Sequence, residues 1–286
     1  MAEARIGIIG GSGLYQMEGL TEVQEVRVDT PFGAPSDVIG VGKIGDTSIA
    51  FLPRHGRGHR LSPTELPARA NIWALKSLGV EQIISVSAVG SLREEIHPLD
   101  LVIPDQIIDR TKSRVNSFFD NGVVAHVGFA DPFCPALSEQ LYHAALKTGV
   151  SVHKGGTYVV MEGPLFSTRA ESNLYRSWGA SVIGMTALPE AKLAREAELC
   201  YATIACATDY DCWHESEEDV TVEMIIANLL KNVETSKQIV RSIVGNLPAR
   251  RDCGCGAALA SAIITDRAMI PAETKERLQL IMGKYI

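Results

Sequence analysis

The stretch YATIACATDYD, residues 201–211, decides the fold class of this chain. Residues 201–208 carry no charge and are mostly apolar, as in a strand that is buried on both faces of a parallel sheet. The run ends abruptly in Asp209 and Asp211. In open α/β sheets, ligands bind at the carboxyl ends of the strands. The stretch therefore predicts a covered α/β sheet that carries its chemistry at one edge.

The segments around this strand alternate between strand and helix patterns. Helix patterns, two of them with Pro at the start and Gly at the end, cover residues 67–79, 135–149, 167–179, 189–199 and the segment from 222 onward. Strand patterns cover 5–10, 82–90, 100–109, 156–164 and 180–185, with a hairpin over 37–53. We expect one α/β domain over residues 1–286: a central sheet flanked by helices, with a helical tail from about residue 246.

Composition and charge exclude several classes of protein. No apolar run approaches the ~18 residues that a membrane span needs. Glu3 and the glycine-rich turn that follows argue against a signal peptide. The net charge of −7 argues against nucleic acid as the partner. We therefore expect a cytoplasmic enzyme that binds neither nucleic acid nor membrane.

Two segments that follow predicted strands are suited to bind an anion. The segment GGSG, residues 10–13, can present backbone N–H groups to a phosphate, although a tight turn without a ligand is the alternative. It is not a dinucleotide fingerprint, because Gln16 stands where the last glycine is required. The guanidinium groups of RHGRGHR, residues 54–60, can each donate two hydrogen bonds to a phosphate. The alternative is that this segment is a solvated basic loop without a ligand. Thr186 can add a hydroxyl donor or cap a helix.

Asp209 and Asp211 would point the same way if the strand continued through them. Two carboxylates without a Cys or His cluster or a third acid are poor metal ligands, and we expect no metal there. They are better placed to hydrogen-bond a flat, nitrogen-rich ring, with loop caps or salt bridges as the alternative. Burial at the end of an apolar strand would raise the pKa of Asp209 and favour its neutral form.

The chain has six cysteines. Cys134, Cys200, Cys206 and Cys212 are scattered in a spacing that fits no zinc template, so we expect buried free thiols. The pair in Cys253-Gly-Cys255 is too close for a zinc knuckle without partners. A strained disulfide or no function at all are the two interpretations of that pair.

Several segments together resemble a known family. They are IGIIGGSGLY, VDTPFGAPSD, RHGRGH, ANIWALKSLG, SAVGSLREEIHPLDLVIPDQIIDRT, FADPFCP, EGPLFSTRAES and MTALPEAKLAREAELCYATIACATDYDCW. They run from residue 6 to about residue 213, and they resemble the S-methyl-5′-thioadenosine phosphorylases of the trimeric purine nucleoside phosphorylase superfamily. The resemblance implies a mixed α/β sheet and reversible phosphorolysis of methylthioadenosine to adenine and methylthioribose 1-phosphate, in purine and methionine salvage. It implies inorganic phosphate as co-substrate, no metal and no organic cofactor.

The resemblance also assigns site residues. The family's phosphate contacts fall on Ser12, Arg54, His55, Ser87, Ala88 and Thr186. Its substrate contacts fall on Met185 under the ribose, Phe166 and Ser167 near the base, Asp209 and Asp211 at the base edge, Val222 at the methylthio pocket and His126 from a neighbouring subunit. Asp209 is then the catalytic acid. A homotrimer or a dimer of trimers is implied.

Two other functions compete with this one. A phosphorylase for 6-oxopurine nucleosides or methylthioinosine belongs to the same superfamily, but Asn in place of Asp209 would have favoured it. A nucleotide-binding oxidoreductase or regulatory module on a Rossmann-like sheet is of another class. The broken glycine fingerprint argues against that class.

Overall fold

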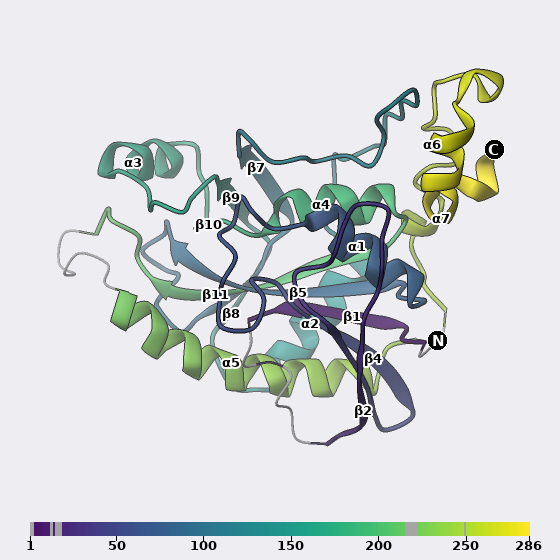
Figure 1. Ribbon diagram of the computed structural model, residues 1–286. Coiled ribbons are helices and arrows are strands. Elements are labelled where there is room, and N and C mark those ends of the chain that lie inside the picture. The colour runs from purple at the N-terminus through teal and green to yellow at the C-terminus, as the bar shows by residue number, and fades with distance from the viewer. Residues whose placement is uncertain (1–2, 12–13, 15–18, 215–221, 249) are drawn as a thin grey trace.

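The computed structural model describes residues 3–11, 14, 19–214, 222–248 and 250–286, with the backbone alone at 222, 224 and 225 (Figure 1). The strands are β1 (Ile6–Gly10), β2 (Leu20–Val26), β3 (Ile39–Ile44), β4 (Thr47–Pro53), β5 (Gln82–Ser91), β6 (Leu101–Ile103), β7 (Gln106–Arg110), β8 (Val152–Lys154), β9 (Thr157–Met161), β10 (Val182–Gly184) and β11 (Cys200–Asp209). Within the described residues they form one sheet in the order β2-β3-β4-β1-β5-β10-β9-β7. β11 also pairs with β5, and it is followed outward by β6 and β8.

β5 and β11 form the centre of the sheet. They run parallel, with Cys200 opposite Gln82 and Asp209 opposite Gly90, and every residue of β11 is buried. β1 runs parallel to both β5 and β4. The carboxyl ends of these four strands therefore lie along one edge. The burial of β11 on both faces, predicted from its sequence, is confirmed.

The helices cover both faces of the sheet. They are α1 (Ala68–Ser77), α2 (Pro135–Leu146), α3 (Arg169–Ser177), α4 (Ala187–Glu196), α5 (Val222–Val244), α6 (Ala272–Arg277) and α7 (Gln279–Met282). α1 and α4 lie on one face, α2 and α5 lie on the other, and α3 lies beyond one end of the sheet (Figure 1). The expected fold class, a mixed sheet flanked by helices, is confirmed.

Local sequence signals act where they were expected. Gly79 follows α1 with a φ of +87°, a conformation that favours glycine. At the start of α3, the backbone N–H of Glu171 donates to Thr168 Oγ1 at 3.2 Å and that of Thr168 donates to Glu171 Oε2 at 2.8 Å, which completes a capping box. β3 and β4 form the predicted antiparallel hairpin.

Four strands differ from the sequence prediction. Residues 100–109 form two strands, β6 and β7, because Pro104 cannot donate to a ladder and interrupts the run. β2 was not expected, because it lies at the edge of the sheet and is mostly exposed, so its sequence lacks a buried apolar face. β8 is only three residues long, too short to leave a periodic signal.

α5 packs on the sheet with a different face from the one its apolar pattern indicates. The sequence of this helix predicts an apolar stripe at Val222, Ile225, Ile226, Leu229, Leu230 and Val233. Two residues of this stripe, Ile226 and Leu230, are 50% and 64% exposed. Asn232 and Ser236 are buried instead. Asn232 Nδ2 donates to the carbonyl oxygen of Ala207 at 3.1 Å, so a polar contact holds the helix against β11.

Among its described residues, the C-terminal segment is helical only in α6, α7 and three short 3-10 helices, so the expected helical tail is present in part, and the segment packs on the body of this same chain. Leu259, Leu278 and Ile281 are buried in the core shared with α1 and α4. The segment also pairs with the loop between β7 and α2, through a bridge between Ala125 and Ile263. α6 and α7 lie at the end of the molecule opposite α3 (Figure 1). No helix within the described residues is long and apolar enough to span a bilayer.

Candidate active site

Side chains from several strands gather at one edge of the sheet. Arg54 follows β4, Ser87 lies in the outer half of β5, and Asp209 ends β11. β10 runs back along β5 and is followed by Thr186. The backbone N–H of Arg54 donates to the carbonyl oxygen of Gly10 at 2.9 Å, which joins the ends of β4 and β1. The structure therefore brings the predicted strand-end residues into one region.

Arg54 is buried in a ring of acceptors. Its Nε donates to Glu190 Oε1 at 2.6 Å, and its Nη2 reaches Glu190 Oε2 at 3.2 Å and Ser85 Oγ at 2.7 Å. Its Nη1 donates to the carbonyl oxygen of Val86 at 2.9 Å. Burial by itself would lower the pKa of Arg54, but the charge and hydrogen bond of Glu190 hold that pKa above its usual value. The fork that we expected to bind phosphate is therefore engaged by Glu190, and one Nη1 hydrogen has no acceptor among the described residues.

Three hydroxyl groups lie near this ion pair. Ser87 Oγ and Thr186 Oγ1 are 2.8 Å apart and share a hydrogen bond. Thr186 occupies the N-cap position of α4 but makes no side-chain capping bond, so its hydroxyl serves Ser87 instead. Tyr158 Oη is buried without a hydrogen-bond partner among the described residues. Burial raises the pKa of Tyr158, while the neighbouring Thr186 and Ser87 lower it. A buried hydroxyl with free bonding capacity suits a polar ligand.

His55 is neutral at neutral pH. Burial, together with the charge of Arg54, lowers its pKa from 6.5 to about 4. Its Nδ1 lies 2.8 Å from the carbonyl oxygen of Leu61. Because that oxygen can only accept, Nδ1 carries the proton and Nε2 presents a lone pair. The ring is also stacked on His59, with ring centroids 4.2 Å apart.

Asp209 and Asp211 lie together, but not for the reason that the sequence suggested. β11 ends at Asp209, and Asp211 has a φ of +52°, so the strand does not continue through both. The chain turns instead, and the backbone N–H of Asp211 donates to Asp209 Oδ1 at 2.8 Å. A β-carbon at Gly90 would lie 3.0 Å from Asp209 Oδ1 and 3.2 Å from Asp211 Cβ. Glycine at position 90 thus leaves room for the turn.

Burial raises the pKa of both carboxyls. For Asp211 it does so from 3.8 to about 6, and the charge of Asp209 adds to the effect. For Asp209 burial also raises the pKa, against hydrogen bonds from Thr208 and from Asp211 that lower it. Thr208 Oγ1 lies 2.6 Å from Asp209 Oδ2 and 3.2 Å from the carbonyl oxygen of Val89. The single Thr208 hydroxyl proton therefore has two acceptors within reach, and the shorter contact is the one to Asp209.

The loops after β9 and β10 border the carboxyl pair. Cys212 Sγ donates to the carbonyl oxygen of Ser167 at 3.3 Å, which places Ser167 beside the turn. Arg114 donates to the carbonyl oxygens of Met185 and, at 3.2 Å, of Met161, and so links the two loops. Phe166 is 50% exposed on this border.

The remaining predicted residues lie elsewhere or outside the described part of the chain. Ala88 is half-buried in β5, next to Ser87. His126 is exposed, and its backbone N–H donates to the carbonyl oxygen of Ala262 in the C-terminal segment. Ser12 and the side chain of Val222 are outside the described residues.

Three residues at the site were not predicted from the sequence. Glu190 is an acid within the otherwise small and apolar run ALPEA, which is the signal that could have indicated a buried partner for an arginine. Asn228 Nδ2 donates to the carbonyl oxygen of Thr208 at 2.7 Å and supports the end of β11. Arg114 had no local signal, because its acceptors are carbonyl oxygens distant in the sequence.

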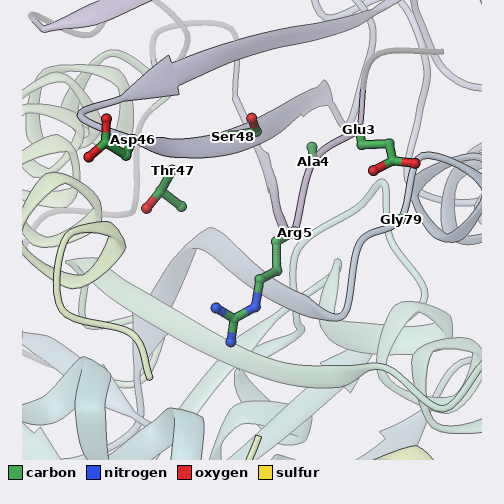
Figure 2. A pocket seen from close by; sticks show the side chains of 7 residues that line it. All are labelled: Glu3, Ala4, Arg5, Asp46, Thr47, Ser48 and Gly79. Atoms are coloured by element: carbon green, nitrogen blue, oxygen red, sulfur yellow. The ribbon is translucent and has the colours of Figure 1, made fainter. Parts of the chain in front are cut away.

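The cavity shown in Figure 2 is not part of this site. It has a volume of about 340 Å³ and is lined by Glu3, Ala4, Arg5, Asp46, Thr47, Ser48 and Gly79. Thr47 begins β4 and Arg5 precedes β1. The cavity therefore lies at the amino ends of the parallel strands, opposite the edge that carries Arg54 and Asp209.

Comparison with known proteins identifies the family. A family model described as "Phosphorylase superfamily" matches residues 5–245. The chain belongs to the phosphorylase superfamily. This phosphorylase is 64% identical, over 99% of its own length and 100% of the relative's, to the S-methyl-5'-thioadenosine phosphorylase of Geobacter sulfurreducens. The family expected from the sequence is confirmed.

Solved structures agree with this assignment. A methylthioadenosine phosphorylase from an Antarctic soil metagenomic library superposes on this phosphorylase with a TM-score of 0.94, at 50% identity over 98% of this chain and 99% of the other. The methylthioadenosine phosphorylase from Schistosoma mansoni in complex with adenine gives a TM-score of 0.82, at 35% identity over 98% of each chain.

The raised pKa of Asp211 predicts a pH-dependent stability cost in this phosphorylase. The folded state prefers the neutral acid. The free energy of unfolding of the wild type should therefore fall by about 3 kcal/mol as the pH rises from about 4 to about 6. Asp211→Asn removes the charge, so its melting temperature without ligands should exceed that of the wild type at pH 8. The difference should vanish near pH 4. Asp46→Asn, in an exposed turn, is the matched control, and an equal gain at both pH values would contradict the assignment.

Proposed function

We propose that the protein catalyses reversible phosphorolysis of S-methyl-5′-thioadenosine to adenine and 5-methylthioribose 1-phosphate. The observation that carries this proposal is the buried pair Asp209 and Asp211 at the same sheet edge as the hydroxyls of Ser87 and Thr186. One group of residues suits a purine edge and the other suits an anion. The family and the names of its relatives agree with both.

The groups assigned to phosphate bind it mainly through hydrogen bonds and less through net charge. Ser87 and Thr186 offer hydroxyl donors, and Arg54 offers the field of its guanidinium and one N–H that has no acceptor among the described residues. Neutral His55 accepts at Nε2, which fits the P–OH group of HPO₄²⁻. Ser12 and Ala88 are assigned to the same phosphate by the resemblance. Because Glu190 neutralises Arg54, phosphate can bind tightly enough to orient and still remain a nucleophile.

The base half of the site divides two tasks between two carboxyls. Asp209, with a raised pKa, is available as a neutral donor toward N7 of the purine. Asp211, with a pKa of about 6, is mostly ionised at neutral pH and accepts from the 6-amino group. A 6-oxo group offers Asp211 no donor, so two acceptors would face each other. The pair therefore selects adenine over hypoxanthine.

The reaction balances with these groups alone. A phosphate oxygen attacks C1′ as the glycosidic C–N bond breaks, and the electron pair of that bond moves onto the purine. Asp209 supplies a proton to the purine, and the proton released when HPO₄²⁻ becomes a phosphate monoester restores the carboxyl. Met185 and Val222 are assigned to the ribose and methylthio group, with Phe166 and Ser167 beside the base. No metal or organic cofactor takes part in the proposed reaction, and a cytoplasmic location remains a prediction.

Replacing the catalytic acid tests the base half. Asp209→Asn should lower kcat on methylthioadenosine by roughly 10²–10⁴, because the general acid is lost, and should shift preference toward inosine. Methylthioadenosine, adenosine, inosine and adenosine monophosphate should be assayed with and without phosphate, with Asp46→Asn as the control. Wild-type turnover should require phosphate and should favour methylthioadenosine. Unchanged rates and selectivity in Asp209→Asn would show that the carboxyls are structural.

The phosphate half is best tested away from Arg54. Removing Arg54 would leave Glu190 buried and unpaired, at a cost of about 3–5 kcal/mol in stability. Ser87→Ala and Thr186→Val should instead raise KM for phosphate by about 10-fold each, since a hydrogen bond to a charged group contributes ~1.5–3 kcal/mol. In the double variant, KM for phosphate should rise by less than the product of the two single increases, because the two hydroxyls bond each other. Ser77→Ala in α1 is the control, and an unchanged KM for phosphate would refute the assignment.

We also propose a homotrimer or a dimer of trimers in which His126 completes a neighbour's site. His126 is exposed on a loop that is bonded to the C-terminal segment of its own chain, so it is presented outward. His126→Ala should raise KM for the nucleoside and leave the oligomer intact by light scattering. Dilution to monomers should abolish turnover. Fully active monomers would disprove this assembly.

A further inference from the structure

Four cysteines from distant parts of the sequence meet at the end of the molecule away from the active site. Their Sγ atoms all lie within 4.8 Å of one another. Cys134 is the N-cap residue of α2 and Cys200 is the first residue of β11. Cys253 and Cys255 flank Gly254 in the C-terminal segment. The partners that the Cys253–Cys255 pair lacked in the sequence are thus supplied by the fold.

The spacing of the sulfurs suits a single ion. Zn–S bonds of about 2.3 Å in a tetrahedron put neighbouring sulfurs about 3.8 Å apart. Cys200 Sγ and Cys253 Sγ are 3.3 Å apart, and no pair in the cluster is separated by more than 4.8 Å. This leaves no room for an iron–sulfur cluster, which places several ions between its thiolates. Four thiolates in a closed tetrahedral set select Zn²⁺ among the common divalent metals.

The surroundings can balance the charge of four thiolates. The backbone N–H of Leu137, in the first turn of α2, is directed at the sulfur of Cys134. The guanidinium of Arg251 lies within hydrogen-bonding reach of the Cys200 sulfur. Arg251 Nη1 is held there by the carbonyl oxygen of Glu198 at 2.8 Å. A helix N-terminus and a guanidinium are the groups that stabilise thiolates.

The cluster is enclosed but reachable. Cys134, Cys200 and Cys255 are buried, whereas Cys253 is only half-buried. Cys253 and Cys255 line a surface cavity of about 400 Å³ whose other walls include Asp131 and Asp252. An ion can therefore reach the sulfurs from solvent through this cavity, which is also lined by Arg195.

We infer that Cys134, Cys200, Cys253 and Cys255 bind one Zn²⁺ in a structural site that fastens the C-terminal segment to β11 and α2. All four positions around the ion are filled by protein, so no position is open for substrate. Binding releases the protons of the four thiols to solvent and involves no change of oxidation state. A strand rises about 3.3 Å per residue, so the ion lies about 30 Å from Asp209 along β11. The site is thus separate from the catalytic groups.

The test begins with the wild type, so that it does not depend on a variant folding. Full-length protein, purified with a reductant and without chelator, should contain one Zn²⁺ per chain by mass spectrometry of the metals. After zinc is removed, Co²⁺ should produce thiolate-to-cobalt charge-transfer absorption and the d–d bands of a tetrahedral site. Adding Zn²⁺ should bleach these bands at one equivalent and slow the reaction of the four thiols with Ellman's reagent by about tenfold or more.

Variants then separate the site from other thiols and from catalysis. Cys253→Ser and Cys255→Ser should lose the metal and melt at a lower temperature, while kcat at 25 °C stays within about twofold of the wild type. Cys206→Ala, a buried cysteine outside the cluster, should keep one Zn²⁺. Reduced wild type that holds no zinc and gives no tetrahedral cobalt spectrum would overturn the assignment. So would bound iron in place of zinc, or a metal-free protein whose mass shows two disulfides among these cysteines.

Discussion

The ion pair between Arg54 and Glu190 is the constraint on which the site depends. Arg54 reaches Glu190 on α4, Ser85 and Val86 on β5, and the carbonyl oxygen of Ile9 on β1. Tyr201 on β11 donates to the same glutamate. One guanidinium therefore sets the relative positions of three parallel strands and a helix. Because a buried charge without its partner is so costly, these elements have little freedom to move apart.

In this arrangement the groups that face a ligand carry little net charge. The buried cation is neutralised within the protein, His55 is kept neutral by burial, and the carboxyls of Asp209 and Asp211 are shifted toward their neutral forms. What faces a ligand is mainly a set of hydroxyls, lone pairs and titratable carboxyls. Such groups can follow the change in charge that accompanies breaking of a glycosidic bond, which a permanently ionised site would resist.

β11 links the two ends of the molecule. Its first residue, Cys200, lies in the cysteine cluster, and its last, Asp209, lies at the candidate active site. Asn228 and Asn232 on α5 bond the carbonyl oxygens of Thr208 and Ala207 and hold the catalytic end. The asparagines on the inner face of α5 are thus explained by the strand that they support. The cysteines hold the other end of that strand against the C-terminal segment.

The sequence by itself determined the elements whose signals are local. The apolar run 201–208, the Pro and Gly bounds of α1 and the Thr168–Glu171 box each reflect the energetics of a few neighbouring residues. They were enough to predict a covered α/β sheet with chemistry at its carboxyl edge. Local patterns also indicated Arg54, Thr186, Asp209 and Asp211 as site residues, and the resemblance to a family supplied the others.

Tertiary structure decided everything that depends on contacts between distant residues. It paired Arg54 with Glu190 and brought Cys134 and Cys200, which looked scattered, to the Cys253–Cys255 pair. It joined Asp209 to Asp211 by a turn where strand alternation had been expected, and it turned Asn232 inward in place of Leu230. The physical reason is the same in each case. A buried polar group needs a hydrogen-bonding partner, and that partner can come from any part of the chain that the fold brings close. The residues next to the group in the sequence therefore do not indicate which partner it has.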